Sequence, residues 1–136
     1  MFIYFVLLFP FLTISSEDGQ HDLHLSLSGN GSTRGHYFIA IYRKSDPFPS
    51  STHAFKRIVR KGAEREVYLG QLPRGTYAIA VFHDENDNAI LDKNLLGIPL
   101  EKYGFSNNAR ATFSAPSFQE ASFNLNTNRH LHVKLK

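Results

Sequence analysis

A period of two in the placement of apolar side chains is the feature that most constrains this chain. It is clearest at residues 76–82, where alternate side chains fall on opposite sides of an extended backbone. One side carries Tyr77, Ile79 and Val81, and the other carries Ala78, Ala80 and Phe82. Because both sides are apolar, the segment is predicted to be a central strand, with one face in the core and the other under a covering segment.

Shorter segments of the same kind occur along most of the chain, separated by turn signals such as Gly29-Asn30-Gly31. These segments are 21–28, 37–43, 55–59, 64–69, 121–126 and 129–136. One turn of helix is expected at 116–120. With about seven or eight short strands and almost no helix, the chain is predicted to be all-β. The expected architecture is an antiparallel Greek-key β-sandwich, immunoglobulin-like, with one long acidic loop.

The first residues, Met1 to Ile14, are almost wholly apolar. A membrane-spanning helix needs about 20 apolar residues, so this run is too short to cross a bilayer. It is typical of a secretory signal peptide, with the small residues Ser15 and Ser16 near a cleavage site. We therefore expect a signal peptide at 1–16 and one sandwich domain at 17–136. The mature protein is expected to be periplasmic or secreted and not an integral membrane protein; a buried N-terminal strand is the alternative.

The chain has no cysteine and a formal net charge of +3. No disulfide and no cysteine-linked lipid can form, so stability must come from burial of the core. The basic residues gather in one cluster, made of Lys56, Arg57, Arg60, Lys61 and Arg65. Such a cluster suits either an anionic partner or the solvated face of a strand. No aromatic residue interleaves these charges, which favours the second interpretation, and no nucleic-acid partner is expected.

The alternation stops after Phe82, and the stretch from His83 to Asn108 holds five carboxylates and five asparagines. A connection of this length is unusual inside a compact domain, and such loops are often functional. Its start follows the D-x-[DN]-x-[DN] spacing of calcium loops, in which side-chain oxygens turn inward around a hard cation. The candidate ligands are Asp84, Asn86, Asn88, Asp92, Glu101 and the main-chain carbonyl of Ile90.

Two positions depart from the calcium-loop spacing. The sixth is Ala89 where such loops have Gly, and the twelfth is Leu95 where they have Glu. An Asx-rich turn, whose side chains bond their own backbone, explains the same residues without a cation. Both interpretations remain open, and Ca²⁺ is the one cofactor that the spacing suggests.

The same loop also carries apolar residues, a combination that suits a recognition surface on a rigid scaffold. We expect Leu96, Ile98 and Phe105 to fold back over the face of Ala78 and Ala80, because small side chains leave room for a covering segment. The expected binding contacts are His83, Tyr103, Asn107 and Asn108. The expected partner is a small ligand or an envelope protein.

Two stretches resemble known families. LGQLPRGTY at 69–77 resembles the strand–turn–strand signature of prealbumin-like and collagen-adhesin B-type sandwiches. HDEN at 83–86, GIP at 97–99 and YGFSNN at 103–108 are similar to the bacterial family known as domain of unknown function 2141. That resemblance implies a small secreted or periplasmic sandwich and supplies no activity. Where the family commonly has Asn-Gly, this chain has Asn88-Ala89, which disfavours a positive φ at residue 89.

Motifs for catalysis are missing from the sequence: there is no nucleophile elbow, phosphate loop, HExxH motif or cysteine. No enzymatic activity is therefore predicted. A hydrolase that uses His83, Asp84 and Glu101 is a weaker alternative, because adjacent residues of a strand point to opposite faces. The sequence thus predicts a non-catalytic binding module with a Ca²⁺ site in the 84–92 loop. An envelope accessory domain without a small ligand is the other alternative.

Overall fold

The computed structural model describes residues 19–29, 31–50, 52–110 and 114–136. The predicted signal peptide at 1–16 lies outside these residues. The strands are β1 (Gln20–Ser28), β2 (His36–Arg43), β3 (Lys56–Lys61), β4 (Glu66–Pro73), β5 (Gly75–Asp84), β6 (Tyr103–Phe105), β7 (Phe123–Leu125) and β8 (Arg129–Lys134). Two short helical elements, η1 (Ser106–Asn108) and α1 (Phe118–Ala121), lie between β6 and β7.

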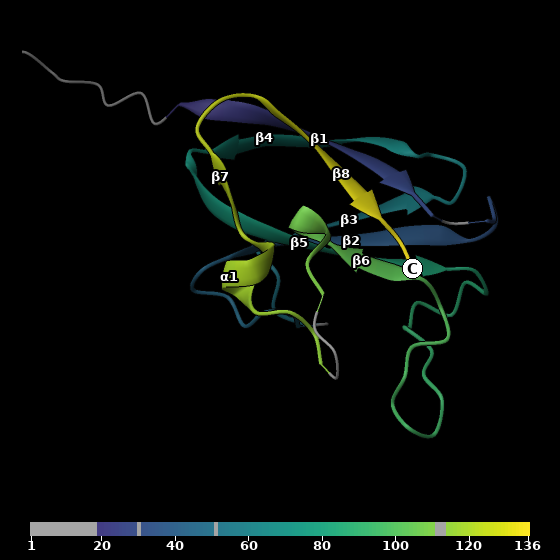
Figure 1. The fold of residues 1–136 in the computed structure, drawn as a ribbon. Helices are drawn as coiled ribbons and strands as arrows, with labels where there is room; N and C mark the ends of the chain where they lie inside the picture. Colours follow the sequence, from purple (N-terminus) through teal and green to yellow (C-terminus); the bar gives the residue numbers. More distant parts are fainter. Residues whose placement is uncertain (1–18, 30, 51, 111–113) are drawn as a thin grey trace, which may run out of the picture.

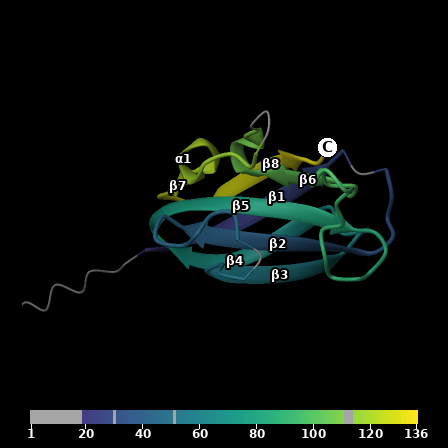
Figure 2. The same cartoon turned by 90° about the horizontal axis from the view of Figure 1, so that it is seen from below.

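The strands form two sheets that pack face to face (Figure 1; Figure 2). One sheet has the order β4-β1-β8, and the other has the order β3-β2-β5-β6, with β7 also paired to β5. The all-β prediction is confirmed. One pair corrects the antiparallel prediction, because β1 and β8 run parallel. A hairpin would force two neighbouring strands to run antiparallel, but β1 and β8 are not joined by one. The chain enters β8 from β7, which belongs to the other sheet, and it can therefore run parallel to β1.

The core lies between the two sheets, and the alternation of the strands supplies it. The inward side chains of β1 and β5 are almost fully buried: Leu23, Leu25, Leu27, Tyr77, Ile79 and Val81. Full burial of one large apolar side chain stabilises the fold by about 1.5–3 kcal/mol relative to exposure. The faces predicted for 76–82 are therefore confirmed, and they fix which side of β5 meets the opposite sheet.

The outer face of β5 is covered by a layer of aromatic side chains. Ala78 and Ala80 lie in one apolar cluster with Phe105, Phe48 and Phe118. The rings of Phe48 and Phe118 meet edge to face at a centroid distance of 5.9 Å, and Phe48 lies 5.9 Å from Phe105. The three phenylalanines are called the aromatic cover below. The prediction that the second face of this strand is covered is confirmed.

Two of the residues predicted to form that cover do not take part in it. Leu96 is 83% exposed and Ile98 is 55% exposed, whereas Phe105 is buried as predicted. The prediction is wrong for the first two because Phe48 and Phe118 already fill the space over the alanines. The chain between β5 and β6 instead leads away from both sheets (Figure 1).

A buried serine ties the end of β6 to its neighbours. The Ser106 hydroxyl accepts a hydrogen bond from the Ile79 N–H at 2.8 Å and donates to the carbonyl of Ala121. Next to it, α1 begins at a capping box, in which the Glu120 N–H donates to Ser117 Oγ and the Ser117 N–H donates to the Glu120 carboxylate. The helical turn predicted at 116–120 is confirmed.

The three residues of β6 were not predicted as a strand, because three residues are too few for a period of two to be seen. In the part of the chain that is described, no helix is long and apolar enough to cross a membrane.

Candidate functional site

The last two residues of β5 open the long loop, and both are buried. His83 is 0% exposed and Asp84 is 1% exposed. The Asp84 carboxylate accepts hydrogen bonds from the N–H groups of Ala89 at 2.8 Å and Asn88 at 3.3 Å. The buried charge is thus compensated by main-chain dipoles, which fold residues 85–89 into a tight turn around it.

Two residues of this turn adopt a left-handed backbone. Asp87 has a φ of 58° and Ala89 has a φ of 61°. The sequence disfavoured a positive φ at residue 89, yet the structure adopts it without glycine. For an alanine the left-handed region costs about 1–2 kcal/mol, so the hydrogen bonds to Asp84 must offset that strain.

Asp92 receives the side-chain amides of both asparagines. Asn86 Nδ2 donates to Asp92 at 2.7 Å, and Asn88 Nδ2 donates to it at 2.9 and 3.1 Å. The Oδ1 atoms of the asparagines accept main-chain N–H groups two residues further on, those of Asn88 and Ile90. These are the Asx turns of the alternative interpretation. The side chain of Ile90 itself points to solvent and is 63% exposed.

Glu101 closes the loop from its far end. Its carboxylate accepts the N–H of Glu85 at 3.1 Å and the N–H of Asp92 at 3.3 Å. Partial burial raises the pKa of Glu101, the two N–H donors oppose this, and the like charges of Asp84 and Asp92 raise the pKa further. Three carboxylates therefore lie near one another in the loop base, which is defined as residues 84–92 and Glu101.

The loop base holds these three carboxylates without a basic partner. Among the described residues, Asp84, Asp92 and Glu101 form no ion pair with Lys, Arg or His. In the same part of the chain, no three His, Asp or Glu side chains surround a common point as metal ligands would. Their oxygens point to N–H groups instead.

The imidazole of His83 is buried and bonded to the main chain. Its Nε2 donates to the main-chain carbonyl of Arg34 at 2.6 Å, and its ring lies 4.8 Å from that of Tyr37. Its Nδ1 lies 3.6 Å from a carboxylate oxygen of Glu85 and has no hydrogen bond within the described residues. No hydrogen bond joins His83 to Asp84 there.

The two asparagines predicted as binding contacts hold chain segments together. Asn107 Nδ2 donates to the carbonyls of Glu120 and Ser122, and Asn108 Oδ1 accepts the N–H of Lys134. Both have positive φ, 59° and 49°. Their side chains are used by the fold, because they fasten η1 to α1 and to β8.

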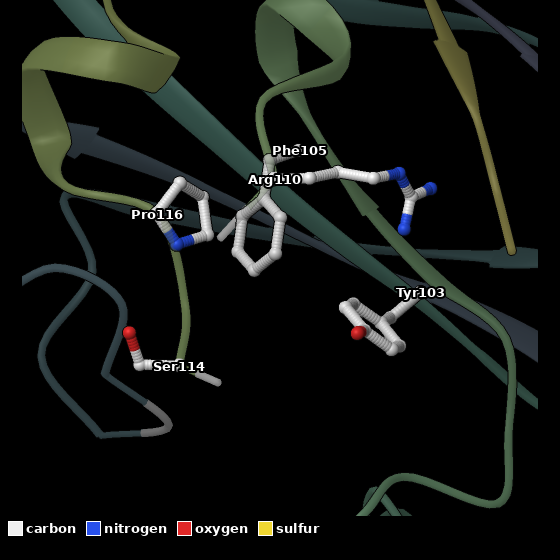
Figure 3. Close-up of a pocket in the computed structure, with 5 residues that line it drawn as sticks. All are labelled: Tyr103, Phe105, Arg110, Ser114 and Pro116. Carbon is white, nitrogen blue, oxygen red and sulfur yellow. The ribbon is translucent and has the colours of Figure 1, made fainter. Parts of the chain in front are cut away.

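Tyr103 borders a small hollow beside the aromatic cover (Figure 3). The hollow has a volume of about 40 Å³ and is lined by Tyr103, Phe105, Arg110, Ser114 and Pro116. A larger, open hollow of about 500 Å³ lies beside it and is lined by Asn108, Arg110, Lys134 and Lys136. The smaller volume is near that of a single water molecule, so Tyr103 has no room for an organic ligand there.

The outermost part of the loop is more exposed than the sequence analysis predicted. Its large apolar side chains are exposed: Leu95 fully, Leu96 by 83%, Leu100 by 67% and Ile98 by 55%. Residues 94–100, called the loop tip below, therefore form an apolar patch. The signal was present in the sequence as four aliphatic residues within six positions, of which Leu96 and Ile98 were predicted to cover β5.

Comparison with known proteins identifies a family for this chain but does not identify an activity. No curated protein and no solved structure matches the chain. One family model matches residues 26–133, and its description is "Uncharacterized protein conserved in bacteria (DUF2141)". This match spans both sheets, the loop base and the loop tip. The resemblance seen in the loop is thus confirmed over most of the chain, which belongs to this family of uncharacterised bacterial proteins.

Proposed function

We propose that this protein is a non-catalytic binding module of the bacterial envelope or exterior, and that the loop after β5 is its binding end. The loop base takes a hard cation such as Ca²⁺ in this proposal. Export is supported by the apolar run at 1–14. The absence of catalysis remains a prediction, supported by the burial of His83 and by its bond to the Arg34 carbonyl.

One observation carries the proposal: three carboxylates gather in the loop base with no basic side chain paired to them among the described residues. Like charges in proximity repel, and partial burial makes each charge harder to hold. A divalent cation removes this repulsion, and Ca²⁺ prefers carboxylate, amide and main-chain oxygens.

A bound cation requires a rearrangement of the loop base. Rotation of the Asn86 and Asn88 amides would bring Oδ1 to the side where Nδ2 now meets Asp92, in exchange for the hydrogen bonds that Oδ1 accepts from the Asn88 and Ile90 N–H groups. The turn is otherwise suited to a cation, since Ala89, at position six of the calcium-loop spacing, has the left-handed backbone that a glycine supplies in such loops. The expected ligands are the oxygens of Asp84, Asn86, Asn88, Asp92, Glu101 and the Ile90 carbonyl.

A second candidate function is favoured by the hydrogen bonds themselves. The loop base satisfies its carboxylates with its own N–H groups and amides, as a purely structural turn does. In that case the protein is an envelope accessory domain without a small ligand.

Calcium titration separates the two candidates. Protein stripped of metal is titrated calorimetrically with Ca²⁺, and its melting temperature is followed with Ca²⁺ and with chelator. Binding to the folded state alone raises the melting temperature with concentration, and at a hundredfold excess over Kd it adds about 2.7 kcal/mol of stability.

The variant for this test is Asp92→Asn, which keeps the size of the side chain and removes one charge. The matched control is Asp87→Asn in the same loop, since Asp87 pairs with His36 at 2.6 Å. Loss of the calcium response in the first variant and its retention in the second supports the cation site. No heat and no change in melting temperature at millimolar Ca²⁺ leaves the accessory-domain function in its place.

A further inference from the structure

The loop tip is an apolar surface in which five of the six main-chain N–H groups donate hydrogen bonds within the loop, the exception being that of Leu95. The Leu96 and Ile98 N–H groups donate to Asn94 Oδ1 at 2.9 and 3.0 Å, and the Gly97 N–H donates to the Asn94 carbonyl at 2.9 Å. The Asn94 N–H donates to the Ile98 carbonyl, also at 2.9 Å. The tip is thus a self-bonded turn, and the φ of 77° at Gly97 is one that glycine adopts without strain.

The next two residues complete this pattern. Pro99 has no N–H, and the Leu100 N–H donates to the Asp92 carbonyl at 2.8 Å. A main-chain N–H that enters an apolar medium without a partner costs several kcal/mol, so only internally bonded chain can enter one readily. The tip therefore combines outward aliphatic side chains with main-chain N–H groups that, except for that of Leu95, do not need water as a partner.

The composition of the loop tip does not suit a protein partner. Stable protein interfaces use about 20–30 residues on each side and are anchored by Trp, Tyr and Arg, with Leu under-represented. The tip has seven residues, all of its large side chains are aliphatic, and it projects from the sandwich as a narrow arm (Figure 1). A fluid phase can close around such a projection, whereas a rigid partner would need a matching groove.

We infer that the loop tip inserts into the surface of a phospholipid bilayer. Leu95, Leu96, Ile98 and Leu100 enter the boundary between headgroups and acyl chains. Lys93 lies next to the tip, forms no ion pair among the described residues, and meets the lipid phosphates. This inference names the partner of the proposed binding module and rests on that function, but it does not require the cation.

Co-sedimentation with sucrose-loaded vesicles tests the inference. The vesicles contain phosphatidylcholine and phosphatidylglycerol in equal parts, and each titration is made with Ca²⁺ and with EDTA. The full chain is compared with Leu95→Ser/Leu96→Ser and with Val59→Ser/Tyr68→Ser. The second double variant removes two exposed apolar side chains from the sheets, where Val59 is 46% and Tyr68 is 48% exposed.

The loop-tip variant is expected to bind about a hundredfold more weakly, roughly tenfold for each leucine that stays in water, and the sheet variant is expected to bind like the unaltered chain. No vesicle binding in either buffer, or equal binding by both double variants, overturns the inference. So does a dimer in sedimentation velocity that the loop-tip variant loses while vesicles bind neither protein, because the tip is then a contact between copies.

The two proposals fail in different ways. The heat released when Ca²⁺ is titrated into the protein without lipid reports only on the loop base. If the protein binds Ca²⁺ but does not bind vesicles, the lipid inference alone is overturned. Vesicle binding in EDTA, together with no calcium heat, overturns the cation site alone.

Discussion

Two regions beside the larger sheet place their apolar side chains in opposite environments. The aromatic cover places Phe48, Phe105 and Phe118 against the small residues of β5. The loop tip turns leucines of similar apolar character into solvent. The difference lies in what anchors each region: buried Ser106 bonds one region to β5 and α1, whereas Asn94 bonds the other region to itself. The region bonded to neighbouring elements covers the outer face of β5, whereas the region bonded to itself projects from the sandwich.

The largest effect is expected at the aromatic cover. Phe105→Ala should lower the free energy of unfolding by about 3–5 kcal/mol, because it leaves a cavity over the alanines of β5. Leu96→Ala should change it by less than about 0.5 kcal/mol, because that side chain is already exposed. Urea unfolding of both variants measures the two values. Equal costs would mean that the loop tip is also packed, and the comparison would fail.

A somewhat smaller effect is expected in the loop base. Asp84→Ala removes the acceptor of two main-chain N–H groups and should cost about 2–3 kcal/mol. The control is Asp87→Ala, whose exposed pair with His36 should contribute less than about 1 kcal/mol. Thermal unfolding of the two variants checks this. A negligible cost at Asp84 would show that the turn is not held by its carboxylate.

An effect of opposite sign is expected at Ala89. Because its φ is 61°, Ala89→Gly should stabilise the protein by about 1 kcal/mol, as glycine removes the left-handed strain. Chemical denaturation measures the gain, and Ala80→Gly, in the middle of β5, should be destabilising in the same assay. Destabilisation at residue 89 would contradict the turn described for the loop base.

The smallest effect concerns protonation. Burial first, and then Asp84 and Asp92, raise the pKa of Glu101 above its usual value of 4.5. The folded state therefore holds this proton more tightly than the unfolded state, and the stability from Glu101 is lost as the pH rises from 4.5 through the folded pKa. Asp92→Asn should lower the pKa, and carboxyl NMR titration measures it. Bound Ca²⁺ should lower it too, so an unchanged pKa with Ca²⁺ would place the cation elsewhere.

The fold was largely predictable because β-strands show their periodicity in short windows. The alternation at 76–82 predicted both faces of β5, and the alternation at 21–28 predicted the strand β1, whose inner face is Leu23, Leu25 and Leu27. The parallel pairing of β1 with β8 was not predictable, because the period of a strand is the same in either direction. The order of strands depends on contacts between distant segments, which a single sequence does not show.

The site was predicted as a region and only partly as an arrangement. The acidic spacing located the loop base, and Asp84, Asn86, Asn88, Asp92 and Glu101 do come together. Residue type alone does not tell whether an asparagine faces a ligand or the main chain. Asn107 and Asn108, predicted as binding contacts, fasten η1 to its neighbours, and Asn108 also lines the open hollow.

The main error was the predicted burial of Leu96 and Ile98, which are exposed in the loop tip, and its cause is physical. Leu96 and Ile98 were assigned to the space over Ala78 and Ala80, which Phe48 and Phe118 occupy. Both pairs are apolar and of suitable size, so hydrophobicity cannot choose between them. The choice depends on the path of each connection, which is fixed by particular hydrogen bonds such as those of Ser106.

The side-by-side pairing of β1 with β8 has a consequence for biosynthesis. During translation, the partner that completes the edge of β1 emerges roughly a hundred residues after it, and it brings Leu131 and Val133 into the interior. Until then one edge of β1 is unpaired and the interior is incomplete, although β4 can already pair with its other edge. The domain should therefore fold only after its final strand has left the ribosome, and a chain stalled before residue 129 should be sensitive to proteases.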